Sequence, residues 1–202
     1  MTALPATIVM ASGNVAKLRE IARLLDGLGV AVIAQSELGV ADIAETGETF
    51  AQNSLSKAAH ASATTGLPAI ADDSGLVVDA LAGAPGVFSA RYAGLDASDD
   101  RNIDKLLQAL KDVERPSRGA AFHCVASFVI PGEPKALVAA GEWRGSILTA
   151  RQGAGGFGYD PVFLDPDTGH SAARLTAEEK DARSQRGKAL RKRVVLIERH
   201  YS

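Results

Sequence analysis

The chain has 202 residues, of which 46% are hydrophobic and 23% charged, and these proportions exclude an intrinsically disordered chain. The formal net charge of −2 provides no basic field for duplex nucleic acid, and no 18-residue apolar run suits a membrane span, so we expect neither partner. The single cysteine, Cys124, excludes an internal disulfide and a cysteine zinc cluster. It fits a reducing compartment, and we expect a cytoplasmic protein with a single domain over residues 1–202.

The first half of the chain alternates between strand and helix patterns. The apolar spacing predicts, in order, a strand over 7–11, a helix over 18–28, a strand over 30–34, a helix over 50–65, a strand over 69–71 and a helix over 98–110. The sequence Asp72-Asp73-Ser74-Gly75 has turn chemistry, and we expect it to end the third of these strands.

The second half is rich in β patterns before it returns to helix. It predicts strands over 120–130 and 136–149, a short strand over 162–164, a helix capped by Thr176 and a basic helix over 184–200. Turn residues at 131–134 join the first two strands into a long hairpin. This order predicts an α/β fold with a mixed central sheet, flanking helices and a long β-hairpin extension, in two lobes around a cleft.

The first segment with candidate chemistry is the turn after the first strand. Ser12, Gly13 and Asn14 precede a predicted helix whose unpaired N–H groups and dipole attract phosphate, and Lys17 adds a mobile positive charge. Gly13 lets the backbone approach a ligand closely. The alternative is an ordinary Ser/Asn helix cap beside a surface lysine.

The second segment is the acidic pair Asp72 and Asp73 after a buried strand. Adjacent carboxylates repel each other unless a positive group lies near them, and a divalent cation would relieve that repulsion. Mg²⁺ suits such oxygen ligands, and a carboxylate that the metal does not fully use can take a proton from an attacking water. The alternative is a plain Asx turn.

The third segment, residues 153–161, contains a Gly-x-Gly-x-x-Gly sequence that continues into an extended run instead of a helix. That context argues against a dinucleotide fold and a bound NAD. A glycine loop with Phe157 and Tyr159 can offer backbone donors and an aromatic face to a flat heterocycle. The alternative is a tight turn with two core aromatics.

The fourth segment is the basic stretch over 174–199, with nine Lys or Arg residues against four Asp or Glu. It is either a solvated helix face or a clamp for a small polyanion. The four histidines have no metal-ligand spacing, and we interpret them as structural or surface residues.

Together these segments resemble the inosine triphosphate pyrophosphatase family, enzymes that act on noncanonical purine nucleoside triphosphates. The resemblance covers nearly the whole chain. Its blocks are Ser12-Gly13-Asn14 with Lys17, Glu45-Thr46-Gly47 with Thr49-Phe50, Asn53 and Lys57-Ala58, Ala71 to Leu76, Gly83 to Gly86 with Ser89 to Tyr92, Gly156 to Pro161, and Glu179-Lys180 with Ser184 and Arg186. It implies a Mg²⁺-dependent homodimer that hydrolyses ITP, dITP and XTP to the monophosphate and pyrophosphate and so removes them from the nucleotide pool.

The resemblance also implies roles for individual residues. Asp73 is the expected general base and a metal ligand, with Glu45 as a second candidate ligand. The expected substrate-binding residues are Ser12, Gly13, Asn14, Val15, Ala16 and Lys17 for the triphosphate, Lys57 for further phosphate charge, Ser74 for a substrate contact, and Phe157, Gly158, Tyr159, Asp160, Lys180, Gln185 and Arg186 for the base.

Two positions depart from the family pattern. Gln185 stands where the family usually has a histidine, so it can donate a hydrogen bond but does not titrate. Gln52 replaces the glutamate usual before Asn53, which leaves the metal ligands near residue 52 open. Base preference and pH dependence can therefore differ from those of the family.

The chemistry of the bases supports such a selectivity. Hypoxanthine and xanthine carry an acceptor oxygen at position 6, whereas adenine carries a donor amine that would leave buried donors unpaired, and such a mismatch can reject a substrate by about 10⁴-fold. Two other functional classes fit the sequence less well. A triphosphate sensor without hydrolysis would have little use for Asp72 and Asp73, and an NAD-linked oxidoreductase would need the dinucleotide fold that residues 153–161 do not provide.

Overall fold

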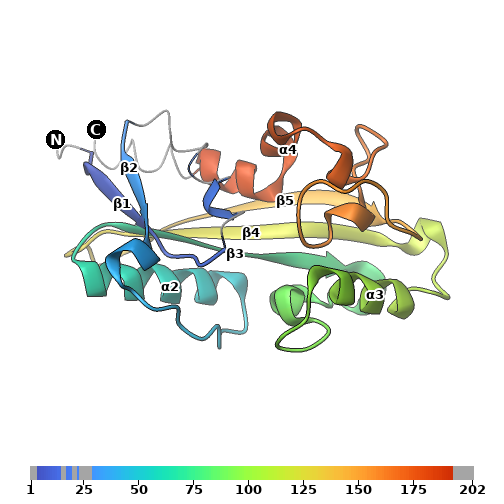
Figure 1. Ribbon diagram of the computed structural model, residues 1–202, viewed down its shortest axis with the longest axis horizontal. Coiled ribbons are helices and arrows are strands. Elements are labelled where there is room, and N and C mark those ends of the chain that lie inside the picture. Colours follow the sequence, from blue (N-terminus) through green and yellow to red (C-terminus); the bar gives the residue numbers. More distant parts are fainter. Residues whose placement is uncertain (1–3, 15–16, 20–21, 23–28, 193–202) are drawn as a thin grey trace. The chain divides into compact units, whose positions relative to one another are not determined.

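The computed structural model describes residues 4–14, 17–19, 22 and 29–192 (Figure 1). The chain divides into two compact units. Unit 1 comprises Met1–Asp73, Cys124–Gly141 and Arg186–Ser202, and unit 2 comprises Ser74–His123 and Glu142–Gln185. Two units agree with the predicted two lobes, and the cleft stays a prediction. Most of the helix predicted over 18–28 lies outside the described residues, although residues 17–19 and 22 are helical.

The strands form one six-stranded sheet in the order β2-β1-β3-β4-β5-β6. Their bounds are Thr7–Met10 for β1, Ala31–Ala34 for β2, Ala69–Val78 for β3, Gly119–Val129 for β4, Leu137–Ile147 for β5 and Phe163–Leu164 for β6. β1 is parallel to β2 and β3, whereas β5 and β6 are antiparallel, so the predicted mixed sheet is confirmed.

The predicted hairpin is also confirmed, as the neighbouring strands β4 and β5. The seven residues between these strands reach about 25 Å at most. A parallel return along an 11-residue strand would need about 36 Å, so the two strands run antiparallel. The hairpin lies within the sheet, with β4 between β3 and β5.

The helices begin and end where local signals predict. They are α2 (Phe50–Thr65), α3 (Asp99–Ala109) and α4 (Ala177–Arg183), and residues 185–192 are helical as well. The side chains of Thr49, Ser98 and Thr176 each accept a hydrogen bond from the backbone N–H three residues later. Gly66 ends α2 in the left-handed conformation, with φ of 68°, which glycine adopts without steric cost.

The prediction that the strand ends before Asp72 is wrong, because β3 runs without interruption through Asp72 and Asp73 to Val78. Turn chemistry at 72–75 is a local preference. Here it is overridden because β3 lies between β1 and β4 in the sheet and its two carboxylates find buried partners.

Unit 1 has an apolar cluster on each face of its strands. On one face α2 covers β1 and β3 through small residues, mainly alanines: Val9, Ala11, Ala58, Ala61, Ala69 and Ala71 (Figure 1). On the other face lie larger residues: Ile8, Met10, Ile70, Cys124, Ala126, Phe128, Ala189 and Leu190. Because strand residues alternate between faces, Asp73 belongs to the α2 face and Asp72 to the opposite face.

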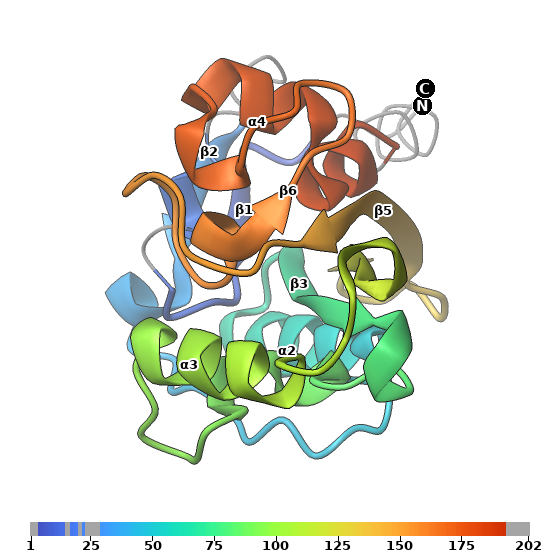
Figure 2. The same ribbon diagram turned by 90° about the vertical axis from the view of Figure 1, so that its right-hand side faces the viewer.

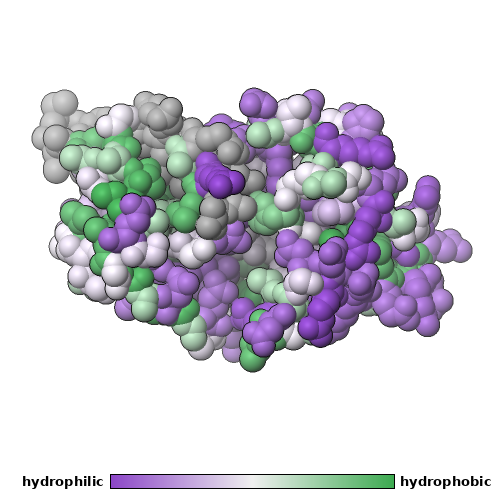
Figure 3. Space-filling view, viewed as in Figure 1, coloured by the Kyte–Doolittle hydropathy of each residue, from purple (hydrophilic) through white to green (hydrophobic). Residues whose placement is uncertain are grey.

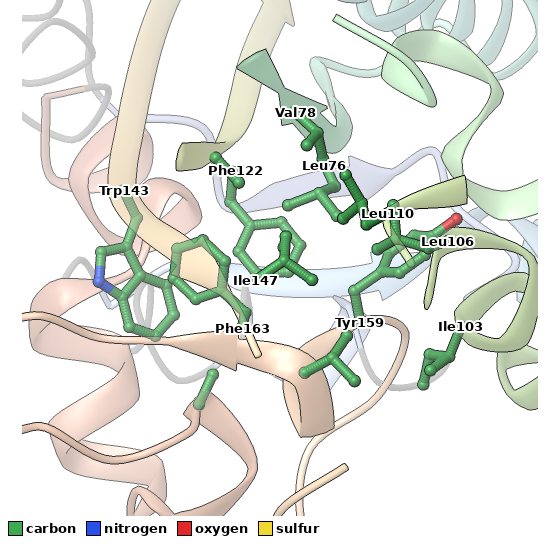
Figure 4. Close-up of a cluster of buried hydrophobic side chains, with 13 residues drawn as sticks. Leu76, Val78, Ile103, Leu106, Leu110, Phe122, Trp143, Ile147, Tyr159 and Phe163 are labelled. Carbon is green, nitrogen blue, oxygen red and sulfur yellow. The ribbon is translucent and has the colours of Figure 1, made fainter. Parts of the chain in front are cut away.

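Unit 2 has its own core, which Figure 4 shows in close-up. The Phe163 ring lies 4.6 Å from that of Phe122 and 5.0 Å from that of Trp143, centroid to centroid. Within this unit α3 and α4 lie on opposite sides of the strands (Figure 2), and hydrophilic residues cover the outer face of α3 (Figure 3). Within the described part of the chain, no helix has the length and apolar character that a membrane crossing requires.

Candidate functional site

Asp73 lies in a buried polar cluster of unit 1, with its carboxylate facing α2. Asn53 Nδ2 donates to Asp73 Oδ2 at 3.1 Å, and Lys57 Nζ donates to Asp73 Oδ1 at 3.4 Å. The two partners are four residues apart on α2, so the helix presents them on one face. Lys57 Nζ also donates to Glu45 Oε1 at 2.5 Å, and its ammonium therefore stands between two carboxylates.

The surroundings of Asp73 make it a stronger base than an exposed aspartate. Burial raises the pKa of Asp73 and the charge of Glu45 raises it further, against the opposing effects of Lys57, Lys17 and Asn53. The pKa of Lys57 is also raised, because the charges of Asp73, Asp72 and Glu45 together outweigh its burial. Lys57 is thus an ammonium at neutral pH, beside a carboxylate suited to accept a proton.

Asn53 links this polar cluster to the loop that carries Glu45. Its Oδ1 accepts from Gly47 N at 2.8 Å, and a Cβ on Gly47 would lie 2.6 Å from the same oxygen, so only glycine fits there. Gln52 Oε1 accepts from the N–H groups of residues 48 and 49 and completes the capping box of α2. Gln52 therefore has a structural role at this helix N-terminus, and a glutamate at residue 52 would fill that role equally well.

Among the described residues of unit 1, Glu45 and Asp73 are carboxylates that could hold a metal ion together, because both contact Lys57. The Lys57 ammonium lies between them as a monovalent cation would. Among the described residues, no group of three or more His, Cys, Asp or Glu side chains is arranged for a metal. Two carboxylates suit Mg²⁺, which takes one or two from a protein and completes its octahedron with waters and phosphate oxygens.

Asp72, on the opposite face of β3, has a different environment. Its Oδ2 lies 3.2 Å from Lys17 Nζ and 3.2 Å from Arg186 Nε, and the Cys124 thiol donates to it at 3.7 Å. These charges and that of Lys57 hold the pKa of Asp72 well below its usual range, although burial works in the other direction. The repulsion expected between the two carboxylates is thus relieved by side chains, separately on each face of the strand.

The turn after β1 has the predicted helix-cap geometry, and its role in phosphate binding stays a prediction. Ser12 Oγ accepts from Asn14 N at 3.2 Å, and Asn14 Oδ1 accepts from Lys17 N at 3.1 Å, which is helix capping. Lys17, however, is no surface lysine, because its side chain is 15% exposed and forms a salt bridge with Asp72. A Cβ on Gly13 would lie 2.7 Å from Asp42 Oδ2, so a larger residue there would displace the exposed Asp42 side chain. Val15 and Ala16 lie outside the described residues.

In unit 2 the glycine loop is held by two carboxylates. Phe157 N donates to Asp160 Oδ2 at 2.8 Å, and Gly158 N donates to Asp99 Oδ2 at 2.6 Å. Lys180 Nζ lies 2.5 Å from Asp160 Oδ2 and 4.5 Å from the centroid of the Phe157 ring. The loop therefore has backbone donors that bind acceptor oxygens, and an aromatic ring with a cation on its face.

Tyr159 differs from its predicted role in base binding. It is 4% exposed, belongs to the core of unit 2, and donates its hydroxyl to Ser89 O at 2.9 Å. Burial raises the pKa of its hydroxyl, so Tyr159 stays neutral. For this residue the core-aromatic alternative is correct, whereas Phe157 is only half-buried.

The remaining predicted residues divide between the units. Ser74 lies on β3 in unit 2. Gln185 begins the helical residues 185–192 and also belongs to unit 2; it is 7% exposed, and no described donor reaches its Oε1. Arg186 belongs to unit 1 and pairs with Asp72. Unit 1 thus contains the candidates for phosphate binding, for metal binding and for the general base. Unit 2 contains most of the candidates for purine binding.

Two residues of this site, Asn53 and Asp72, were not predicted as site residues, although Asp72 was predicted as one half of an acidic pair. Asn53 precedes Lys57 by one helical turn, and that spacing was the signal that could have found it. Nothing local marks Asp72 as the partner of Arg186, which is 114 residues away in the chain.

Comparisons with known proteins agree on one family. Residues 8–195 match the model of the Ham1 family. The dITP/XTP pyrophosphatases of Yersinia pseudotuberculosis and Escherichia coli K12 are 57% and 53% identical to this chain over 185 residues, which cover 91% of it and 94% of each relative.

Solved structures give the same result. A HAM1 protein from Coxiella burnetii has a TM-score of 0.88 and 47% identity, with coverage of 95% of this chain and 98% of that one. A nucleoside-triphosphatase / dITP/XTP pyrophosphatase from Mycobacterium abscessus has a TM-score of 0.75 and 42% identity, with coverage of 93% and 98%. The predicted fold class is thus confirmed.

Proposed function

We propose, because the chain belongs to the Ham1 family, that it hydrolyses noncanonical purine nucleoside triphosphates, namely ITP, dITP and XTP, to the monophosphate and pyrophosphate. The relatives named dITP/XTP pyrophosphatases support the substrate class. The observation that carries the proposal is the polar cluster of unit 1. There the buried Asp73 carboxylate, whose pKa is raised, contacts Lys57, and the neighbouring Asp72 pairs with Lys17. Hydrolysis of a phosphoanhydride needs these groups: a base for water and cations for phosphate.

In this reaction Asp73 takes the proton of the attacking water as the water adds to the α-phosphorus. Asn53 orients the carboxylate by its hydrogen bond to Oδ2, which leaves Oδ1 on the side of Lys57. Lys57 and Lys17 neutralise phosphate charge, and the turn at 12–14 adds backbone donors at a helix start. The bond broken is the one between the α- and β-phosphates, so pyrophosphate leaves.

We also propose Mg²⁺ as the cofactor, held by Asp73 and Glu45. When bound, it would polarise phosphoryl oxygens and reduce the charge of the triphosphate. The Lys57 ammonium has three donors, so it can bind a phosphate oxygen in addition to its two carboxylates.

The purine is assigned to unit 2. The face of Phe157 suits a flat base, and the N–H groups of Phe157 and Gly158, which here bind carboxylate oxygens, suit the 6-oxo group of hypoxanthine or xanthine. Adenine presents a donor at that position and cannot accept from these N–H groups. Gln185, buried and without a charge change near neutral pH, makes base recognition insensitive to pH around 7.

A homodimer in the cytoplasm completes the proposal. Light scattering on the purified protein should give twice the mass of one 202-residue chain.

One assay tests the reaction and its base. The purified protein is incubated with a panel of nucleoside triphosphates and Mg²⁺, and pyrophosphate and orthophosphate are measured separately. We expect pyrophosphate from ITP, dITP and XTP, little from ATP, and loss of activity when EDTA removes the metal. Asp73→Asn should lower kcat by about 10²- to 10⁴-fold, as expected for loss of a general base.

Asp112→Asn is the matched control, because Asp112 is an exposed carboxylate in unit 2 and its loss should leave kcat unchanged. Binding of dITP without hydrolysis would indicate a sensor, and orthophosphate as the first product would place the broken bond elsewhere. Near wild-type turnover in Asp73→Asn would remove Asp73 from the mechanism.

A further inference from the structure

We propose that Asp72 is a positioning residue that fixes the Lys17 ammonium, through a carboxylate oxygen shared with Arg186, where it meets the phosphates of the substrate. The inference rests on the proposed function, since it concerns how the same site binds a phosphate chain. It gives the first acidic residue of the Asp72-Asp73 pair a task distinct from that of the second.

The geometry consists of one carboxylate oxygen between two cations. Asp72 Oδ2 lies 3.2 Å from Lys17 Nζ and 3.2 Å from Arg186 Nε, and the Asp72 side chain has no exposed surface. Arg186 is 2% exposed, so it cannot leave Asp72 for water without a large cost. Arg186 therefore fixes the position of the carboxylate oxygen that Lys17 binds.

Lys17 is the member of this trio that can contact a ligand. Its side chain keeps 15% exposure, and an ammonium that gives one donor to Asp72 retains two for phosphate oxygens. A lysine on a four-carbon chain has many rotamers, and a salt bridge to a buried carboxylate restricts them before the substrate arrives. Such preorganisation lowers the cost of placing a point charge against a phosphate.

The contacts on the two faces of β3 favour the same assignment. Asp72 contacts the cations Lys17 and Arg186, whereas Lys57 contacts the carboxylates of Glu45 and Asp73. Lys17 and Arg186 suit an anionic phosphate, and Glu45 and Asp73 suit a metal ion and a base.

A double-mutant cycle between Asp72 and Lys17 tests the inference. Asp72→Asn and Lys17→Met are made singly and together, and kcat and KM are measured with dITP. We expect each single variant to lose about 10²-fold in kcat/KM, the effect typical of a misplaced group, and the double variant to lose no more than Lys17→Met alone. Effects that multiply in the double variant would overturn the proposal, as would near wild-type activity of Asp72→Asn.

A second readout separates positioning from a loss of folded protein. Binding of inorganic pyrophosphate, measured by calorimetry, should weaken in Asp72→Asn and Lys17→Met alike, with the same lack of additivity. Asp165→Asn is the matched control: this buried aspartate of unit 2 accepts from Trp143, so its loss lowers stability and leaves pyrophosphate binding unchanged. If Asp72→Asn fails to fold, Asp72→Glu retains the charge but displaces Lys17, and it takes the place of the asparagine variant in the cycle.

The two readouts also distinguish this inference from the proposed function. If the wild-type protein releases no pyrophosphate from dITP or XTP, the proposed function fails, while the cycle on pyrophosphate binding still measures the link between Asp72 and Lys17. If the wild-type protein hydrolyses dITP but the effects of the two substitutions multiply, the function stands and the positioning role fails. No binding of pyrophosphate by the wild-type protein would also overturn the positioning role.

Discussion

Two adjacent aspartates on β3 have opposite electrostatic environments. Asp72 has a lowered pKa because Lys17 and Arg186 stabilise its charge, and Asp73 has a raised pKa because burial and Glu45 disfavour its charge. The alternation of side chains along a strand is what separates them, since each faces the residues of a different side of the sheet. A charge that its surroundings stabilise and a charge that they disfavour can thus be neighbours in sequence.

The signs of these pKa shifts predict opposite effects on stability. A lowered folded-state pKa means that ionised Asp72 stabilises the fold above its ordinary pKa of about 3.8, and that this stabilisation is lost as the pH falls further. A raised folded-state pKa means that ionised Asp73 destabilises the fold at pH 7, and that the penalty disappears as the pH falls below 3.8.

We therefore expect Asp72→Asn and Asp73→Asn to move the Tm at pH 7 in opposite directions. The first leaves Arg186 buried beside a neutral amide, which costs about 3 kcal/mol and lowers the Tm by roughly 6–12 °C. The second removes a disfavoured charge and raises the Tm while it abolishes most activity, as at other strained sites. Scanning calorimetry measures both, and a lower Tm for Asp73→Asn would contradict the assigned electrostatics.

At the scale of elements, the C-terminal end of α3 depends on the side chain of Arg118, which follows the helix in the chain. Arg118, 4% exposed, donates to the carbonyl oxygens of Leu110 at 2.5 Å, Val113 at 2.9 Å and Leu148 at 3.0 Å. The first two of these carbonyls follow the last turn of α3, where helices leave acceptors without partners. A guanidinium in this place satisfies them and also complements the helix dipole.

Replacement of Arg118 should therefore reduce stability without a direct effect on the candidate site. Arg118→Met leaves three carbonyls without their charged donor, and we expect a loss of about 3 kcal/mol in the free energy of unfolding. Arg118→Lys retains the charge but lacks the planar set of donors, so an intermediate loss is expected. Urea denaturation measures both values. Equal stability of the methionine variant and the wild type would show that water replaces this arginine.

How well an element was predicted depends on where its determinants lie. The starts of α2, α3 and α4 follow from a cap and a partner three residues later, and these signals are local. The continuation of β3 through Asp72 was missed because its determinants are tertiary. A buried Asp-Asp pair becomes acceptable in a strand only with Arg186 and Asn53 in place, and the sequence does not reveal those contacts.

At the scale of the whole molecule, the order of strands and helices predicted an α/β protein, and the family blocks predicted most of the candidate site. The unit to which each candidate residue belongs was not predictable, because unit 2 is an insertion into unit 1 made of two segments. Tyr159 is an example: its motif indicated base binding, whereas its side chain packs in the core of unit 2. Motifs identify a family more reliably than they separate ligand contacts from structural ones.

The two units should nevertheless unfold together, because three strands are shared between them. β3, β4 and β5 each continue from one unit into the other, at residues 73/74, 123/124 and 141/142. A strand that loses its hydrogen bonds in one unit frays toward the other, so partial unfolding has little to stabilise it. The chain provides one probe for each unit: Cys124, the single cysteine, is 1% exposed in unit 1, and Trp143, the single tryptophan, is 3% exposed in unit 2.

We expect the reaction of Cys124 with a thiol reagent and the fluorescence of Trp143 to change at the same urea concentration, because cooperative unfolding exposes both residues at once. Phe163→Leu, which weakens the core around Trp143, should lower both midpoints by the same amount even though Cys124 lies in the other unit. A Cys124 transition that precedes the Trp143 transition, or a variant that shifts only the Trp143 midpoint, would show that each unit folds by itself and that the shared strands do not couple them.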